Sequence, residues 1–73
     1  MITLEKCALR LKALREDHDL TQTDVATILK TTQQVYSRYE NEKNEIPIHH
    51  IITLSRFYKV SCDYILGETD EMN

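Results

Sequence analysis

The stretch from Thr21 to Glu40 constrains the fold most, because it reads as two short helices joined by a tight turn. Thr21 is a good N-cap, since its hydroxyl can accept a hydrogen bond from a backbone N–H of the first turn, and Asp24 follows at capping-box spacing. The apolar positions that come next share one helical face, and they are Val25, Ala26 and Leu29. Thr32 can cap the second helix. We therefore predict two helices that cross closely at the small side chain of Ala26.

The second of these helices has two chemically different faces. Its buried side is expected at Tyr36 and Tyr39, which lie three residues apart. The opposite side carries polar groups that can make the bidentate hydrogen bonds offered by base edges in a DNA major groove, and its members are Gln33, Gln34, Ser37 and Arg38. Solvation is the usual role of a surface glutamine or arginine, but clustering on one face of the second helix of a pair favours DNA contact. This arrangement is typical of a helix-turn-helix.

Composition favours an all-α fold for the rest of the chain. Glycine and proline occur once each, at Gly67 and Pro47, so strands joined by hairpins are poorly supported. At 73 residues the chain forms one domain with little room for a catalytic cleft. No apolar run approaches the roughly 18 residues of a membrane span, and the N-terminus lacks the apolar segment of a signal peptide, so we expect a cytoplasmic protein. Cys7 and Cys62 have no metal-ligand or CxxC spacing and are expected to be reduced packing residues.

The charge balance argues against a general polyanion binder. Nine basic and twelve acidic residues give a net charge of −3. Three of the acidic residues lie near the C-terminus, at Glu68, Asp70 and Glu71, and residues 1–67 carry nine of each sign. We expect residues 1–67 to form the domain, with a locally basic face, and residues 68–73 to form a short, mobile acidic tail.

A first helix is predicted from about Leu4 to Asp17, with Thr3 as its cap. Its core stripe is expected at Leu4, Cys7, Ala8, Leu11 and Leu14. Arg10 and Lys12 lie elsewhere on this helix and are expected to be solvated. Arg15 differs, because it is at the end of the helix nearest the two-helix unit.

Two further helices are predicted after a polar loop that ends at Pro47. Helix four should run from about Ile48 to Lys59, with a wide apolar stripe formed by Ile48, Ile51, Ile52, Leu54, Ser55 and Tyr58. Ser61 can cap a last short helix from Cys62 to Leu66, and Gly67 can end it.

Several separated signatures give the chain a family likeness. They are L-T-Q-x-x-x-A at Leu20–Ala26, S-R-Y-E at Ser37–Glu40 and V-S-x-D-Y-I-L-G at Val60–Gly67. With these motifs in this order, from about Leu9 to Gly67, the chain resembles the lambdoid repressor and Cro family of DNA-binding domains, also called the XRE family. The resemblance implies a compact five-helix bundle of the lambda-repressor type, in which helices two and three form the helix-turn-helix.

The resemblance also implies roles for particular residues. It implies base contacts by Gln33, Gln34 and Arg38, and phosphate or backbone contacts by Gln22, Asn41, Lys43 and Arg15. Ser37, on the same polar face, is also expected to contact bases, and Thr32, at the start of this helix, to contact phosphate. Arg15 would in addition pair with Glu40, neutralising a carboxylate that DNA would otherwise repel. The family often has glycine where this chain has Lys30 and Glu42, so those positions are expected to carry backbone strain if they need a positive φ.

The leading hypothesis is a sequence-specific transcriptional regulator, expected to be a repressor, that binds double-stranded DNA as a homodimer on paired half-sites about 34 Å apart. Candidates for the dimer contact are Phe57 and Tyr64, whereas Tyr58 and Ile65 are at least as well explained as core. The alternative is an antitoxin or other protein-interaction module on the same scaffold, which the acidic tail would suit.

An enzyme is a poor hypothesis. His49 and His50 are adjacent, so their side chains are expected to diverge, and His18 lies in a turn. No arrangement of a nucleophile with a base, paired carboxylates or a glycine-rich phosphate loop can be defended. We therefore expect no catalytic residue, metal, cofactor, small-molecule substrate or membrane partner.

Overall fold

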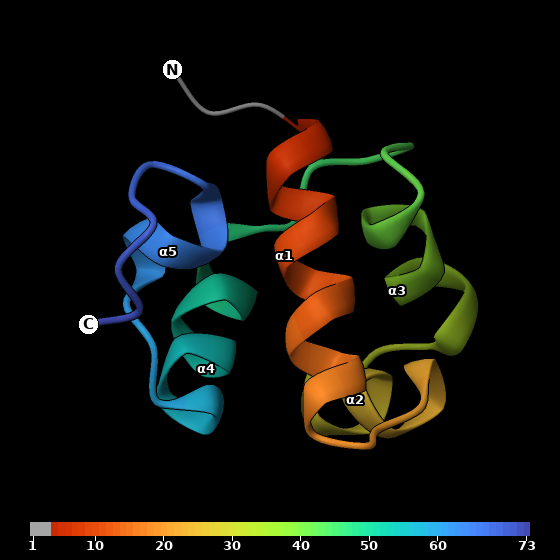
Figure 1. The fold of residues 1–73 in the computed structure, drawn as a ribbon. Coiled ribbons are helices and arrows are strands. Elements are labelled where there is room, and N and C mark those ends of the chain that lie inside the picture. The colour runs from red at the N-terminus through yellow and green to blue at the C-terminus, as the bar shows by residue number, and fades with distance from the viewer. Residues whose placement is uncertain (1–3) are drawn as a thin grey trace.

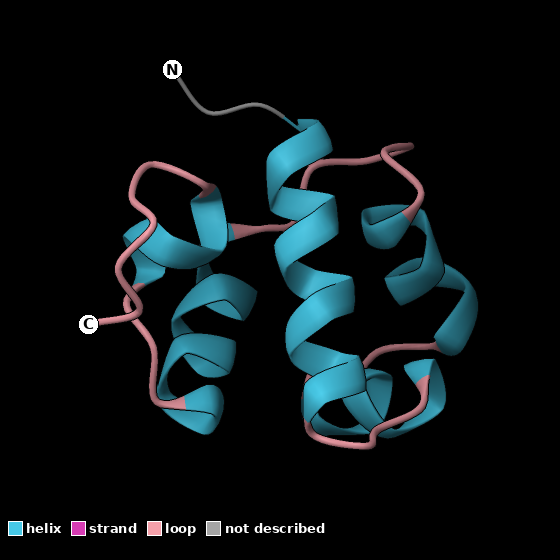
Figure 2. Ribbon diagram, in the orientation of Figure 1, coloured by secondary structure: helices cyan, strands magenta, loops and turns pink. Residues whose placement is uncertain are grey.

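The computed structural model describes residues 4–73, and this part of the chain folds into five α-helices without a strand (Figures 1 and 2). The helices are α1 (Leu4–Asp17), α2 (Gln22–Ile28), α3 (Gln33–Glu40), α4 (Ile48–Tyr58) and α5 (Cys62–Leu66). The predicted all-α bundle of five helices is confirmed. The capping role expected of Thr3 lies outside the described residues.

Side-chain caps set where α2, α3 and α5 begin. The hydroxyl of Thr21 accepts a hydrogen bond from the Asp24 N–H at 3.1 Å, and the Thr21 N–H donates to the Asp24 carboxylate at 2.9 Å, which completes the predicted capping box. Thr32 accepts from the Val35 N–H at 3.2 Å at the start of α3. Ser61 caps α5 in the same way. The caps at Thr21 and Thr32 therefore fix where α2 and α3, the helix with the polar edge, begin.

The helix α1 lies between two pairs of helices (Figure 1). It packs against α3 on one side and α5 on the other, while α2 packs on α3 and α4 on α5. The buried side chains come from all five helices, and the largest fully buried ones are Tyr36, Leu11, Leu54, Ile65 and Val25. Within residues 4–73, no helix is both long and apolar enough to cross a bilayer.

Two turns adopt the left-handed conformation at positions where the family often has glycine. Lys30, between α2 and α3, has φ 58°, and Glu42, after α3, has φ 60°. Both positions therefore do need a positive φ, which disfavours a residue with a Cβ. Lys59 also has φ 60° and ends α4, so this helix stops at Tyr58, one residue before the predicted boundary.

The apolar stripe of α4 is narrower than predicted. Ile51, Leu54 and Tyr58 are buried, whereas Ile48 is 61% exposed and Ile52 is 39% exposed. The buried stripe is therefore narrower than the predicted apolar stripe, because Ile48 and Ile52 lie on the side of α4 away from its buried residues. Leu4, also assigned to the core stripe of α1, is 38% exposed.

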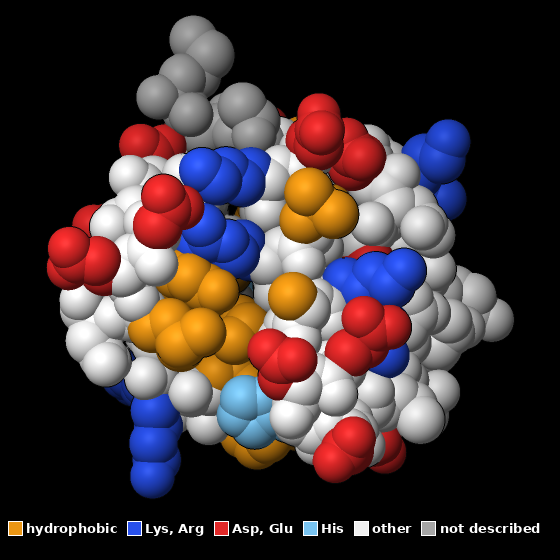
Figure 3. Space-filling view, viewed as in Figure 1, with side chains coloured by type: hydrophobic (Ala, Val, Ile, Leu, Met, Phe, Trp, Pro, Cys, Tyr) orange, Lys and Arg blue, Asp and Glu red, His pale blue; other side chains and the backbone are white. Residues whose placement is uncertain are grey.

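Arg10 is not a solvated residue of α1, and that prediction is also wrong. Its Nη1 donates to the carbonyls of Tyr64 at 2.7 Å and Thr69 at 3.0 Å, its Nη2 donates to Asp70 at 2.8 Å, and its guanidinium lies 3.9 Å from the centre of the Tyr64 ring. The reason is that residues 68–72 fold back along α5, where the Ser61 N–H donates to the Met72 carbonyl. Figure 3 shows basic side chains directly beside the hydrophobic patch on this side of the molecule.

Candidate nucleic-acid interface

The helix α3 presents a polar edge because two buried tyrosines anchor its other side. Tyr36 is fully buried and Tyr39 is 8% exposed, and their rings meet edge to face with centroids 6.1 Å apart. The residues predicted for base contact lie on the opposite side, where Gln33, Gln34 and Arg38 are exposed and Ser37 is half-buried. The arrangement matches the division of faces that the sequence suggests, since 3.6 residues per turn separate the two sets.

A chain of hydrogen bonds links this edge to the interior. The Gln33 Nε2 donates to the Gln22 Oε1 at 2.6 Å, and the Gln22 Nε2 donates to the Glu40 Oε1 at 3.2 Å. Arg15 closes the chain, with its Nε and Nη2 donating to the two oxygens of Glu40 at 2.8 and 3.1 Å. Its Nη1 donates to the Leu20 carbonyl at 3.0 Å. The chain joins α1, α2 and α3, so the position of the polar edge of α3 is coupled to α1.

The inner end of this chain is a buried ion pair. The side chain of Glu40 is 3% exposed and that of Arg15 is 13% exposed. Burial alone would raise the pKa of Glu40, but the hydrogen bonds from Arg15 and Gln22, together with the nearby Tyr36 hydroxyl, hold it below its ordinary value. The bond to Glu40 likewise raises the pKa of Arg15. Glu40 is therefore ionised at pH 7, and its charge is neutralised by Arg15 beside the polar edge of α3.

Two tyrosine hydroxyls lie inside the domain near this ion pair. Burial raises the pKa of Tyr58 to about 12, and it raises the pKa of Tyr36 as well. Among the described residues neither hydroxyl has a hydrogen bond of good geometry. The Tyr36 hydroxyl is close enough to Glu40 to stabilise the charge of the carboxylate. Its contact with Glu40 is polar but lacks the geometry of a hydrogen bond.

The loop after α3 folds back onto the end of that helix. The N–H groups of Lys43 and Asn44 both donate to the Arg38 carbonyl, at 2.9 and 3.3 Å, through the left-handed turn at Glu42. The side-chain Nδ2 of Asn41 donates to the Ser37 hydroxyl at 3.0 Å. Asn41 and Lys43 are both exposed. The two residues predicted to touch the DNA backbone after α3 thus lie beside its C-terminal end.

Val35 is a candidate for base contact that the sequence analysis missed. It lies on α3 and is 36% exposed. An apolar side chain at this edge can contact the methyl group of thymine. The spacing alone does not single it out, because Val35 lies four residues before Tyr39 and therefore at the margin of the buried stripe.

The other chemically notable side chains do not form a second site. His49 and His50, expected to diverge, have ring centroids 4.2 Å apart, so that prediction is wrong; burial and then His49 lower the pKa of His50. Cys7 is buried and Cys62 half-buried, and both are free thiols. Among the described residues no group of three or more His, Cys, Asp or Glu could hold a metal ion.

Two short helices joined by a tight turn, the second with a polar face turned outward, form the arrangement of the helix-turn-helix class of DNA-binding domain. The chain belongs to the helix-turn-helix family of the XRE type, which it matches over residues 11–65, a segment that contains all of α2, α3 and α4. This is a family of DNA-binding transcription regulators, so the predicted family and fold are confirmed.

Two relatives illustrate the range of the family. The chain is 40% identical over 62 residues to the uncharacterized HTH-type transcriptional regulator YobD of Bacillus subtilis, an alignment that covers 85% of this chain and 55% of YobD. It is 35% identical over 63 residues to Antitoxin PezA of Streptococcus pneumoniae, covering 86% of this chain and 40% of PezA. The chain thus spans about half or less of the length of these relatives. No solved structure matches the chain significantly.

Proposed function

We propose that this chain is a sequence-specific regulator of transcription, acting as a repressor, that inserts α3 into the major groove of double-stranded DNA. The observation that carries the proposal is the outward edge of α3, held on one side by Tyr36 and Tyr39 and on the other by the Gln33–Gln22–Glu40–Arg15 chain. An edge fixed in this way loses little side-chain entropy on binding. The cytoplasmic location expected from the sequence is part of this proposal.

The exposed groups of α3 suit base edges of different kinds. Gln33 uses one N–H for Gln22, so its carbonyl oxygen and its other N–H are available to the N6 and N7 groups of adenine. The exposed guanidinium of Arg38 matches O6 and N7 of guanine. Each such pair discriminates between bases by roughly 1–3 kcal/mol. Gln34 and Ser37 complete the edge.

Phosphate contacts would place the domain along the groove. The residues proposed for them are Gln22, Thr32, Asn41, Lys43 and Arg15. The Thr32 hydroxyl accepts the capping bond and can still donate its own proton. Arg15 has five N–H groups, of which three are engaged inside the protein, so two can reach an anion. Arg15 is therefore first a positioning residue and only second a phosphate contact.

A homodimer on paired half-sites is part of the proposal, because one recognition helix covers only a few base pairs. The surface candidates named from the sequence are Phe57, which is 44% exposed, and Tyr64, which is half-buried under Arg10. Tyr58 and Ile65 are core residues.

Selection of bound sites from random duplex DNA tests the function directly. The wild-type protein should enrich a two-fold symmetric site. Gln33→Ala and Arg38→Ala should each relax particular base positions, whereas Lys43→Ala should weaken binding to all sites about equally and reduce the salt slope by about one. Lys12→Ala, an exposed change on α1, is the matched control and should alter neither property. Failure to enrich any sequence would refute the proposal.

A protein-interaction module is the second candidate, favoured by the likeness to Antitoxin PezA. In that case the main ligand would be a protein and DNA binding would be secondary. Salt dependence separates the two, since binding through phosphates weakens steeply as salt rises, whereas an apolar protein interface need not. A target bound equally well at low and high salt would favour the second candidate.

A further inference from the structure

The outward side of α4 carries an apolar stripe that ends in a base. Ile48, Ile52 and Arg56 follow one another at four-residue intervals, and all three are exposed. Residues four apart lie on the same helix face, one above the other. We call these three residues the outer stripe of α4. Because Ile51, Leu54 and Tyr58 already fill the inner side, the outer stripe has no role in the core.

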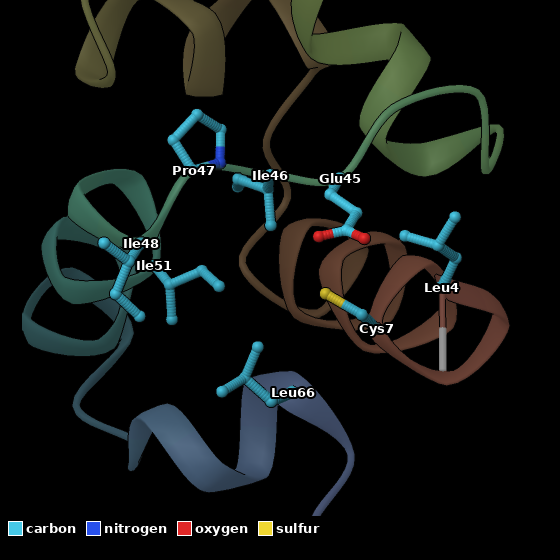
Figure 4. A pocket seen from close by; sticks show the side chains of 8 residues that line it. All are labelled: Leu4, Cys7, Glu45, Ile46, Pro47, Ile48, Ile51 and Leu66. Carbon is cyan, nitrogen blue, oxygen red and sulfur yellow. The ribbon is translucent and has the colours of Figure 1, made fainter. Parts of the chain in front are cut away.

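The N-terminal end of the outer stripe borders an apolar pocket that contains an acid (Figure 4). The pocket has a volume of about 490 Å³ and is lined by Leu4, Cys7, Glu45, Ile46, Pro47, Ile48, Ile51 and Leu66. In Figure 4 the Glu45 carboxylate extends from the loop toward Cys7, while Ile48 and Ile51 lie on α4 and Leu66 reaches up from α5. Glu45 is the charged residue of this lining, and it is exposed.

The order of groups along this surface is therefore acid, apolar, apolar, base. A surface with opposite charges at its two ends is complementary to itself when a second copy is turned around a two-fold axis, because each acid then meets a base. A parallel arrangement would place Arg56 beside Arg56 and Glu45 beside Glu45. The charge order thus selects one relative orientation of two copies.

We propose that a second copy of this chain packs antiparallel on the outer stripe of α4, with Ile52 at the two-fold axis. This inference rests on the proposed function, which needs two copies on paired half-sites, and it assigns the surface that joins them. It differs from the sequence-based choice of Phe57 and Tyr64. None of the residues proposed to touch DNA belongs to the outer stripe.

The dimensions of an α-helix allow the cross-pairing. With a rise of about 1.5 Å per residue, Ile48 and Arg56 lie about 6 Å on either side of Ile52 along the axis. Arg56 of one copy then lies opposite Ile48 of the other, at the mouth of the pocket. Its aliphatic stem can follow the apolar walls while the guanidinium reaches the Glu45 carboxylate, as long basic side chains commonly do. The same contact forms twice in the symmetric pair.

Sedimentation of the full chain in the absence of DNA tests the inference. The wild type should associate reversibly with concentration. Ile52→Lys should weaken association by roughly tenfold or more, since it places two like charges at the axis. Arg56→Glu and Glu45→Arg should each weaken it, and the double variant Glu45→Arg with Arg56→Glu should restore it. Thr53 and Phe57 are also exposed on α4 but lie outside the stripe, so Thr53→Lys and Phe57→Ala should associate as strongly as the wild type.

Binding to DNA distinguishes failure of this inference from failure of the proposed function. Ile52→Lys should bind a single half-site like the wild type and lose roughly tenfold or more on paired half-sites, where linked binding is lost. Three results would overturn the inference: association that persists in Ile52→Lys, association that is lost in Phe57→Ala, and association that the double charge exchange fails to restore. A wild type that stays monomeric on paired half-sites would overturn it as well. A wild type that associates but binds no DNA would instead refute the proposed function.

Discussion

Glu40 is a buried carboxylate in a domain proposed to approach a polyanion, and Arg15 makes this arrangement stable. Replacing Glu40 by Ala removes two bonds to Arg15 and one to Gln22, and leaves a guanidinium that is 13% exposed without its partner. We expect the free energy of unfolding at pH 7 to fall by about 3 kcal/mol, since breaking a buried pair costs 3–5 kcal/mol. Urea unfolding measures it. Glu16→Ala, an exposed change, should cost less than about 0.5 kcal/mol.

The same pair makes stability depend on pH at the acid end. The pKa of Glu40 is lower in the folded protein than its ordinary value, so the folded state binds this proton more weakly than the unfolded state does. Its contribution is complete above the ordinary pKa of glutamic acid and is lost as pH falls through the folded-state pKa. The difference in unfolding free energy between wild type and Glu40→Gln should therefore shrink below about pH 4.5. A constant difference down to acid pH would contradict this expectation.

Removing the hydroxyl of Tyr58 and removing that of Tyr36 should change the free energy of unfolding by different amounts. Burying a hydroxyl without a hydrogen bond costs about 1–3 kcal/mol. Tyr58→Phe should therefore leave the free energy of unfolding unchanged or raise it by about 1 kcal/mol. Tyr36→Phe should give less or no gain, because its hydroxyl stabilises the charge of Glu40. Thermal unfolding of the two variants side by side measures the difference, and a loss of stability in Tyr58→Phe would count against this account.

At the scale of the helices, the sequence predicts where a helix begins and ends better than it predicts which of its side chains are exposed. Thr21, Thr32 and Ser61 act on backbone groups within the next three residues, so their effect is visible in the local sequence. Which side of α4 is covered depends instead on where α5 and the preceding loop lie. Ile48 and Ile52 are apolar at helical spacing, and nothing in that spacing shows that residues 4–73 leave their side of α4 exposed.

The candidate site shows the same division between local and distant information. The two faces of α3 follow from its own periodicity. The Arg15–Glu40 pair joins residues 25 apart and was expected only through the family resemblance. The bond between Gln33 and Gln22 was not predicted, because it depends on how α2 crosses α3. Contacts across helices need the packed structure or a known relative.

The left-handed turn between α2 and α3 is a position where a substitution should raise the stability of the domain. Lys30 has φ 58°, a conformation that costs a residue with a Cβ roughly 1 kcal/mol or more. Lys30→Gly should therefore raise the free energy of unfolding by about 0.5–1 kcal/mol, measured by urea unfolding. The control is Lys12→Gly inside α1, which should lower it by about 1 kcal/mol. A loss of stability in Lys30→Gly would mean that the side chain makes a contact worth more than the strain.

At the scale of the whole molecule, α1 connects the two halves through two arginines on different sides. Arg15 reaches α3 and its polar edge, and Arg10 reaches α5 and residues 69–70. The second connection is close-packed: Gly67 ends α5 with φ 82°, and a Cβ there would come within 2.8 Å of the Lys6 side chain. The C-terminal side of the domain is therefore tied to the same helix that positions the polar edge of α3.

Arg10 should hold residues 68–72 against the domain, and its loss should release them. Its side chain is 15% exposed and makes two bonds to carbonyls besides the ion pair with Asp70. We expect Arg10→Ala to lower the free energy of unfolding by about 2 kcal/mol, since bonds from charged donors contribute about 1.5–3 kcal/mol. Hydrogen exchange at the Ser61 amide, which donates to the Met72 carbonyl, should become faster.

Asp70→Asn separates the carbonyl bonds from the ion pair. The Asp70 side chain is 87% exposed, so its charge should contribute less than about 0.5 kcal/mol, and exchange at Ser61 should change little. Arg10→Lys keeps the charge but loses the planar fork that reaches two carbonyls at once, and should fall between the other two variants. If Asp70→Asn were as damaging as Arg10→Ala, the ion pair would be the main attachment of the C-terminal residues, and the carbonyl bonds would be secondary.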